Sequence, residues 1–354
     1  MCSSSSCGWC SRSRKDRGRC VAGPCPREGG ATGFYCPCST GVPHPVTCVI
    51  VNIHPPSGSQ IHIEHGDHRA TLTEVGATVR TYSVAGRDVF TPFGEDELAP
   101  ASHGAVLLPW PNRLRDGQYT FDGIEHQLPV TEVPRSTAIH GLVCWERWDV
   151  VEQSPSAVTF ELHLVPTPGY PFDLVARVTY ALSDAGLRVT ARTTNVGTTD
   201  APYGVGFHPW LSPGDASVDE CTLRLDARTR VTTDERLLPT GTEPAAGDYD
   251  LREPRLLAGI DLDDAYVDVL RDEDDLSWMR LAAPDGRTAA VWMDPSMGTW
   301  QVCTGDHVSA AGYRRTGVAA EPMSCVADAF RTGERLVRLA PGASHEAVWG
   351  ATLL

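Results

Sequence analysis

Two ionisable residues occupy stretches of this sequence that are otherwise almost uncharged. His208 lies in "GVGFHPW" (204–210), and Glu321 lies in "GVAAEPM" (317–323). An unperturbed imidazole titrates near pH ~6.5 and can give or take a proton at neutral pH. A carboxylate among small apolar residues is either a desolvated base or a buried ion-pair partner. Together the two side chains could perform general acid–base catalysis, although neither is decisive alone.

Two further stretches carry polar residues suited to ligand binding. In "LLPWPNR" (107–113), prolines flank Trp110 and precede Asn112 and Arg113. Arg113 could bind a ligand, or it could simply close a surface ion pair. His140 precedes a glycine in "AIHG" (138–141), and a histidine of this kind is often only a hydrogen-bonded structural residue.

The segments around these residues alternate apolar and polar side chains with a period of two, which predicts β-strands. The pattern predicts strands within 70–90 with a break near Gly76, a strand in 157–165, and a hairpin over 174–197 that turns at 183–186. A second hairpin is predicted over 276–294 around Pro284-Asp285-Gly286. Helical periodicity is scarce, and no glycine-rich phosphate loop joins a strand to a helix. The expected fold is all-β, a large antiparallel β-sandwich with one concave sheet face for a ligand.

The composition narrows the class of ligand. The 354 residues carry a formal net charge of -15, and 41% are hydrophobic. Six of the 30 basic residues but only two of the 45 acidic residues precede Ser57, so the remainder is still more acidic. Such a surface repels nucleic acid and anionic lipid, and no apolar run is long enough to cross a membrane. We therefore expect a cytoplasmic protein whose partner is a small, neutral molecule, with no nucleic acid and no membrane involved.

The first 56 residues differ from the rest. Eight of the 12 cysteines fall within the first 48 residues, in a Ser-, Gly- and Pro-rich context. Cys7-Gly-Trp-Cys10 and Cys36-Pro-Cys38 do not repeat as paired zinc knuckles, so no metal site is predicted there. We interpret residues 1–56 as a disordered leader or a misassigned start, and residues 57–354 as the folded domain.

In order along the chain, six stretches resemble motifs of the aldose 1-epimerase (galactose mutarotase) family, and the resemblance runs from about Ser57 to Leu354. They are "NRLRDGQYTFDG", "AIHG", "GFHPWL", "DLDDAYVDV", "WQVCTGD" and "AAEPMSCVADAF". Each is weak alone, but six in the family's order form a specific signal. "LLPWPNR" is most similar to a bacterial branch whose substrates are less settled than galactose.

The resemblance implies a sandwich of the galactose mutarotase-like type that needs no cofactor and interconverts the α and β anomers of a hexose. It implies that Glu321 is the general base at the anomeric hydroxyl and that His208 is the general acid at the ring oxygen. The residues implied to bind the sugar are Arg113, His140 and Asp263, or Asp264 if the match is offset by one.

Ring opening removes a proton from O1 while another reaches O5, so we expect the carboxylate and the imidazole on opposite sides of the sugar ring. Asn112 is a further candidate for substrate binding, and three tryptophans could stack on the sugar or equally belong to the core: Trp110, Trp145 and Trp210. The active form is expected to be a monomer or a homodimer.

Several alternatives stay open. An anionic, phosphorylated or sulfonated hexose would need cations beyond Arg113, and the candidates are Arg115, Arg147, Arg314 and Arg315. A non-catalytic carbohydrate-binding protein could keep the same sandwich. In "HIEHGDH" (62–68), His62 and Glu64 share a strand face while His65 points away, so no metal site is expected. Cys303 stands where the family commonly has an aromatic residue, which bears on substrate preference.

Overall fold

The computed structural model describes residues 34–35, 45–46 and 55–354, and the chain divides into two units, Met1–Ile53 and His54–Leu354. In the first unit, β1 (Phe34–Tyr35) pairs antiparallel with β2 (Pro45–Val46). The expectations about Cys7, Cys10, Cys36 and Cys38 lie outside the described residues. Within the described part of the chain, no helix is both long and apolar enough to span a membrane.

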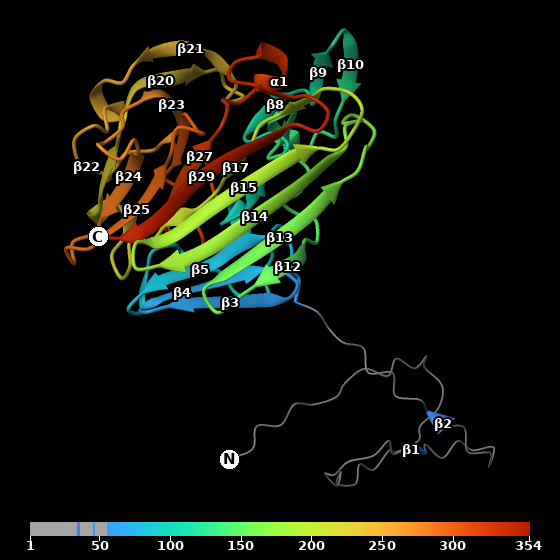
Figure 1. Ribbon diagram of the computed structural model, residues 1–354. Helices are drawn as coiled ribbons and strands as arrows, with labels where there is room; N and C mark the ends of the chain where they lie inside the picture. Colours follow the sequence, from blue (N-terminus) through green and yellow to red (C-terminus); the bar gives the residue numbers. More distant parts are fainter. Residues whose placement is uncertain (1–33, 36–44, 47–54) are drawn as a thin grey trace, which may run out of the picture. The chain divides into compact units, whose positions relative to one another are not determined.

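The second unit is built on two large antiparallel sheets, which Figure 1 shows together with the shorter hairpins. The first, here called the long sheet, has nine strands. In spatial order they are β12 (Asp149–Gln153), β13 (Ala157–Leu164), β14 (Leu174–Ser183), β15 (Gly186–Asn195), β29 (Ser344–Leu353), β25 (Thr288–Met293), β24 (Ser277–Ala282), β19 (Thr222–Leu225) and β22 (Arg255–Leu256).

The second sheet, here called the site sheet, has eight strands. Seven follow the order β21 (Pro239–Pro244), β20 (Ala227–Thr233), β23 (Asp263–Val269), β26 (Thr299–Cys303), β27 (Val318–Met323), β17 (Gly206–Phe207) and β7 (Val106–Leu107), and β18 (Trp210–Leu211) pairs with β27.

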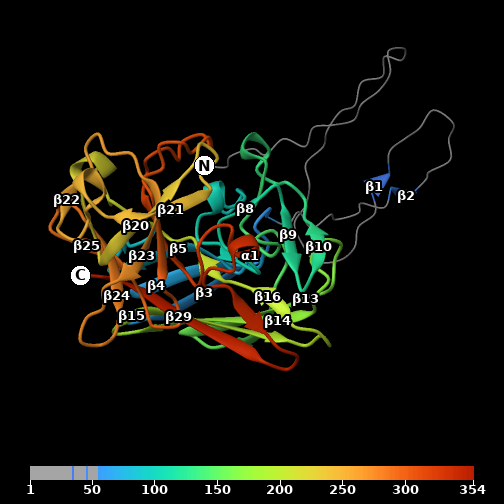
Figure 2. The same cartoon turned by 90° about the horizontal axis from the view of Figure 1, so that it is seen from above.

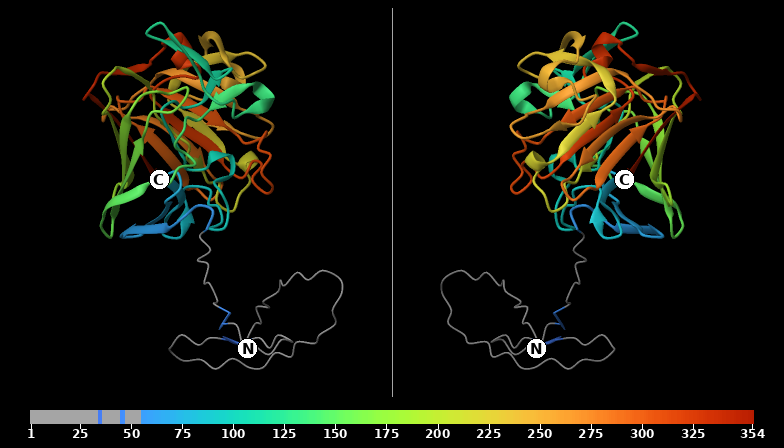
Figure 3. Two further views of the ribbon diagram at one scale, coloured as in Figure 1. Left: turned by 90° about the vertical axis from the view of Figure 1, so that its right-hand side faces the viewer. Right: turned by 90° about the vertical axis from the view of Figure 1, so that its left-hand side faces the viewer.

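Smaller sheets and short helices complete this unit. The four-stranded sheet contains β3 (Gln60–His65), β4 (His68–Thr73), β5 (Thr78–Val84) and β6 (Arg87–Asp88), and its blue strands lie at the lower edge in both views of Figure 3. The two-stranded pairs are β8 (Arg113–Arg115) with β11 (Thr137–Ile139), β9 (Gln118–Phe121) with β10 (Ile124–Gln127), and β16 (Ala201–Tyr203) with β28 (Val337–Leu339).

Helices are short. The one α-helix that the described residues contain, α1 (Ala329–Thr332), lies beside β9, as Figure 2 shows from above. The 3₁₀ turns are η1 (Pro100–Ser102), η2 (Val133–Arg135), η3 (Val218–Glu220) and η4 (Gly247–Tyr249).

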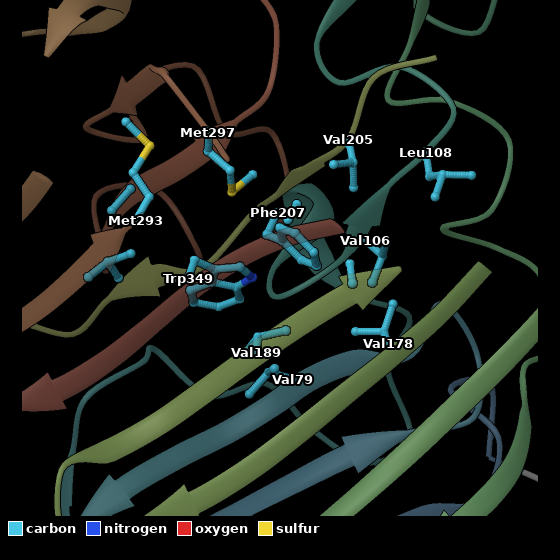
Figure 4. Close-up of a cluster of buried hydrophobic side chains, with 14 of the residues drawn as sticks. Val79, Val106, Leu108, Val178, Val189, Val205, Phe207, Met293, Met297 and Trp349 are labelled. Atoms are coloured by element: carbon cyan, nitrogen blue, oxygen red, sulfur yellow. The ribbon is translucent and has the colours of Figure 1, made fainter. Parts of the chain in front are cut away.

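The core fills the space between the two large sheets. Trp349 of β29 packs against Phe207 of β17, with ring centroids 5.2 Å apart. Figure 4 shows these rings among valines of both sheets, including Val189 of β15 and Val106 of β7. Burial of such large apolar side chains is the main force that holds two sheets face to face.

The strand pattern predicted from period-two alternation is confirmed. The hairpin of β14 and β15 turns between Ser183 and Gly186, and β24 and β25 flank the predicted turn around Asp285. β4 ends at Thr73 and β5 begins at Thr78, so the predicted break near Gly76 lies between them. The all-β sandwich is therefore the observed fold.

The histidines of β3 and β4 have separate partners. His62 is hydrogen-bonded to the hydroxyl of Thr71, and His68 to that of Tyr82, each at 3.0 Å. His65 contacts Asp184 at 2.8 Å. Across the residues that the structure describes, no group of three or more His, Cys, Asp or Glu side chains could hold a metal ion.

Candidate active site

A cavity of about 330 Å³ opens on the face of the site sheet that points away from the core. Alternation along β26 produces this arrangement: Trp300 and Val302 enter the core, while Gln301 and Cys303 take the opposite face. Glu321 of β27 lies directly opposite Gln301 in the sheet register. The cavity brings together seven of the predicted site residues: Asn112, Arg113, His140, His208, Trp210, Asp263 and Glu321.

His208 is held by its backbone between two glycine-containing segments. It follows β17 directly. Its backbone carbonyl accepts a hydrogen bond from the N–H of Gly104 at 2.8 Å, and its backbone N–H donates to the carbonyl of Ala105 at 3.1 Å. A Cβ on Gly206 would lie 2.7 Å from Cβ of Pro111, so only glycine allows β17 to approach this closely. The strand therefore presents the His208 ring at a defined place in the cavity wall.

His140 and Asn112 both sit in left-handed backbone conformations, with φ of 63° and 57°. The N–H of His140 donates to the carbonyl of Asn112 at 3.0 Å. At Gly141, a Cβ would lie 2.1 Å from the carbonyl oxygen of Leu108, so the chain packs too tightly for any other residue. These contacts fix the His140 ring 5.2 Å from the His208 ring, measured between centroids.

Glu321 and His208 form the reactive pair of the cavity. Nε2 of His208 lies 3.4 Å from Oε1 of Glu321, and both side chains are almost fully buried. Nδ1 of His208 and Oε2 of Glu321 have no hydrogen-bond partner among the described residues. Buried polar atoms are rarely left unpaired, so the protein leaves the hydrogen-bonding capacity of this pair partly unsatisfied. The two side chains lie side by side in this structure, whereas we expected them on opposite sides of the sugar ring.

Burial shifts the pKa values of the pair in opposite directions. Loss of water raises the pKa of Glu321 well above its usual range, and the charge of Asp263 adds to this while Arg113 partly offsets it. Burial lowers the pKa of His208 well below its usual range, with smaller contributions from His140, His103 and Arg113. The cavity thus favours the uncharged form of each group, which makes the Glu321 carboxylate a stronger base than a carboxylate in water.

A chain of polar contacts connects the sugar-binding candidates. The amide of Asn112 donates to Gln301 at 3.2 Å, and the amide of Gln301 donates to Asp263 at 2.6 Å. Nη2 of Arg113 lies 3.7 Å from Asp263. Of the two adjacent acids, Asp263 lines the cavity, whereas Asp264 is turned away and binds Arg230 at 2.7 Å.

The tryptophans divide into different environments. Trp210 lines the cavity and stacks on the buried ring of His103, with centroids 4.4 Å apart and planes within 6°. Trp110 does not line it: this ring is buried in the core, 5.5 Å from Phe330. Trp145 is 54% exposed and lies outside the cavity lining. Of the two alternatives for Trp110, stacking on the sugar or burial in the core, the structure shows burial in the core.

The sequence analysis missed several residues of the site. Glu132 receives two hydrogen bonds from Arg113, to Oε2 at 2.9 Å and to Oε1 at 3.2 Å. His307, Val308 and Ser309 reach the rim from the loop after β26. Neither Glu132 nor residues 307–309 lie in a stretch with strand periodicity or a recognised motif. Only the six-motif resemblance pointed to the strand that contains Gln301. A larger open groove of about 580 Å³, lined by β9, β10 and Arg331, contains none of the predicted site residues.

The comparisons with known proteins identify the family. The family model described as aldose 1-epimerase matches residues 59–351. The chain belongs to the aldose 1-epimerase family. As a member of the aldose 1-epimerase family, it is an isomerase-type enzyme acting on sugars.

Individual relatives cover most or part of the chain. It is 34% identical over 304 residues to the uncharacterized protein YihR of Escherichia coli (strain K12), covering 85% of this chain and 95% of that protein. It is 33% identical over 163 residues to galactose mutarotase of Rattus norvegicus, covering 43% of this chain and 45% of that one.

Solved structures of other aldose epimerase homologues share the fold. The GalM/aldose epimerase homologue from C. elegans matches with a TM-score of 0.75 at 21% identity, over 84% of this chain and 98% of that chain. A putative aldose 1-epimerase from Escherichia coli K12 matches with a TM-score of 0.72 at 20% identity, over 84% and 99% of the two chains.

Proposed function

We propose that this enzyme is an aldose 1-epimerase that interconverts the α and β anomers of a neutral hexose by acid–base ring opening. The observation that carries the proposal is the contact of 3.4 Å between His208 Nε2 and Glu321 Oε1 inside a sugar-sized cavity. Each side chain keeps a second polar atom that no described residue satisfies. A paired acid and base of this kind meets the needs of hemiacetal opening.

The adjacent placement fits the geometry of the substrate, because O1 and O5 are bonded to the same carbon. Glu321 takes the proton of the O1 hydroxyl, and the O1–H electron pair forms the C1=O1 double bond. The C1–O5 bond breaks, and O5 keeps that electron pair and takes a proton from Nε2 of protonated His208. Rotation about C1–C2 and the reverse transfers close the ring as the other anomer. The pair shares one exchangeable proton. In the uncharged pair that burial favours, this proton is on Glu321, so it passes to Nε2 of His208, 3.4 Å away, before Glu321 acts as the base.

Sugar hydroxyls would be held by the polar wall around this pair. Asp263 accepts and Arg113 donates hydrogen bonds, and the ring of Trp210 forms part of the lining. His140 keeps a buried Nδ1 that has no partner among the described residues. Such groups fix the sugar so that C1 meets the acid–base pair, which is where positioning contributes to rate.

The charges of the wall favour a neutral sugar over an anionic one. Within the described cavity lining, the cations are Arg113 and Arg135, and they face three carboxyl groups: Glu132, Asp263 and Glu321. None of the arginines considered for an anionic sugar lines the cavity. Arg115 pairs with Asp234, Arg147 pairs with Glu74, Arg315 pairs with Asp306, and Arg314 is exposed.

The test is anomer exchange measured by magnetisation-transfer NMR on the full chain with glucose, galactose, glucose 6-phosphate and a sulfonated hexose. We expect acceleration for a neutral hexose, and a loss of roughly 10²- to 10⁴-fold in Glu321→Gln and in His208→Asn. Exposed Glu334→Gln is the control and should exchange like the wild type.

Other outcomes would change the proposal. Exchange of only the phosphorylated or sulfonated sugar would overturn the neutral substrate. Sugar binding without exchange, unchanged in Glu321→Gln, would indicate a carbohydrate-binding protein instead. Full turnover by a folded His208→Asn variant would remove His208 from the reaction.

A further inference from the structure

Glu132 lies in the cavity wall next to Arg113, and all its carboxylate contacts come from within the protein. Oε2 accepts hydrogen bonds from Nε of Arg113 at 2.9 Å and from the hydroxyl of Thr137 at 2.7 Å. Oε1 accepts from Nη2 of Arg113 at 3.2 Å and from Nη1 of Arg135 at 2.8 Å. The side chain is 15% exposed, so its charge is poorly screened by water.

The backbone around Glu132 holds this carboxylate in place. Glu132 and Thr137 form an antiparallel bridge, in which the N–H of Glu132 donates to the carbonyl of Thr137 at 2.9 Å. The turn η2 between them brings Arg135 back to the same carboxylate. The loop is therefore closed on itself, and Glu132 has one defined position relative to Arg113.

The contact with Arg113 is bidentate, which fixes the plane of the guanidinium as well as its distance from the carboxylate. The same guanidinium lies 3.7 Å from Asp263, the next carboxylate of the wall. Without Glu132, the long Arg113 side chain would be held at one end only. Its remaining donors would then no longer point at a constant place in the cavity.

Glu132 also balances positive charge in this wall of the cavity. Arg113 and Arg135, the cations that the described cavity lining contains, both direct donors to this one carboxylate. With Glu321 in the uncharged form that its burial favours, these two cations face two charged carboxylates, Glu132 and Asp263. Removing the charge of Glu132 would then leave one excess positive charge at short range in a partly dry site, which attracts anions.

We infer that Glu132 is a positioning and specificity-determining residue: it orients Arg113 toward the sugar and cancels the positive charge that would otherwise admit anionic sugars. The inference rests on the proposed epimerase function, and it concerns which sugars the same site accepts. Glu132 does not itself move a proton in this scheme.

The experiment compares the wild type with Glu132→Gln, which keeps the shape of the side chain and removes its charge. For the neutral hexose that the wild type turns over, KM should rise about tenfold while kcat changes less than about threefold. For glucose 6-phosphate, kcat/KM should rise about tenfold over the wild-type value. The ratio of the two specificities is a readout that loss of stability alone would not move.

Two control variants separate position from charge. Thr137→Val removes one hydrogen bond to Glu132 but keeps the carboxylate, so it should raise KM for the neutral sugar without improving use of glucose 6-phosphate. Glu161→Gln removes the charge of a partly exposed carboxylate that pairs with Arg177 on the long sheet, and both specificities should stay at wild-type values.

The outcomes distinguish this inference from the proposed function. If the wild type exchanges anomers and Glu132→Gln keeps the wild-type KM and preference, the inference is overturned and the proposed function stands. If the wild type binds sugar without exchanging it, the proposed function fails, and the dissociation constants of the neutral and phosphorylated sugars test Glu132 by the same expected ratio. If no sugar binds, both are overturned.

Discussion

At the residue scale, the site contains buried polar groups that lower the stability of the folded protein. Buried polar atoms without partners cost free energy, and the cavity contains several of them on Glu321, His208 and His140. The pKa shifts of Glu321 and His208 have the same origin, because burial penalises the charged form of each. Activity and stability should therefore be opposed at these positions.

Glu321→Gln should stabilise the protein while slowing anomer exchange roughly 10²- to 10⁴-fold. Because burial raises the pKa of Glu321, the folded state binds its proton more tightly than the unfolded state. This contribution to stability is fully present below the unfolded value near pH ~4.3 and is lost as pH rises through the folded pKa. We expect Glu321→Gln to gain roughly 1–3 kcal/mol at pH 8 and little at pH 4.

Urea unfolding of both proteins at pH 4, 6 and 8 measures this difference. The exposed Glu334→Gln serves as the control and should follow the wild type at each pH. An equal effect of Glu321→Gln at pH 4 and pH 8 would show that ionisation of Glu321 does not limit stability.

At the element scale, short strands place the catalytic candidates by backbone contacts. β17 is only Gly206–Phe207, yet it lies between β27 and β7, and His208 follows it directly. The loop after β27 is tied to the same region, because the N–H of Asp328 donates to the carbonyl of Arg113 at 2.7 Å. Val326 and Ala327 of this loop are buried.

Gly206→Ala tests whether close backbone approach positions His208. The new methyl group would lie 2.7 Å from Cβ of Pro111 and 3.0 Å from Cγ of Met323, so the strand must shift. We expect a loss of about 1–3 kcal/mol in the free energy of unfolding and a fall in kcat of at least about tenfold.

Gly241→Ala is the matched control, since its nearest neighbour would be the hydroxyl of Thr232 at 3.5 Å, an ordinary contact. Thermal unfolding and anomer exchange measure both variants. Wild-type values in Gly206→Ala would contradict the steric argument.

At the scale of the whole molecule, one aromatic cluster joins the two large sheets behind the site. Trp349 of the long sheet contacts Phe207 of the site sheet, and the ring centroid of Phe90 lies 6.3 Å from that of the same indole. Figure 4 shows the rings of Trp349 and Phe207 in this cluster. Since His208 follows Phe207 in the chain, packing between the sheets supports the position of the catalytic candidate.

Trp349→Ala should destabilise the enzyme by about 3–5 kcal/mol, because it removes a fully buried ring and leaves a cavity between the sheets. Trp145→Ala removes an equally large ring that is 54% exposed, and it should change stability by less than about 0.5 kcal/mol. Denaturant unfolding measures both. Similar losses in the two variants would show that the Trp349 cluster does not hold the sheets together.

The sequence by itself determined the strands, because alternation of apolar and polar side chains is a local property that each strand carries independently of its partners. This is why the hairpin of β14 and β15 and the all-β fold could be predicted. The motif resemblance also indicated Glu321 and His208, which the structure brings within 3.4 Å.

Only the tertiary structure decided which side chains meet. Strand register turns Asp263 into the cavity and Asp264 toward Arg230. Packing between distant segments buries Trp110 in the core and leaves Trp210 in the cavity wall. Glu132 carries no local signal, because its importance comes from Arg113 and Arg135 converging on it. Most such contacts join residues that are far apart in the sequence, so local sequence patterns cannot predict them.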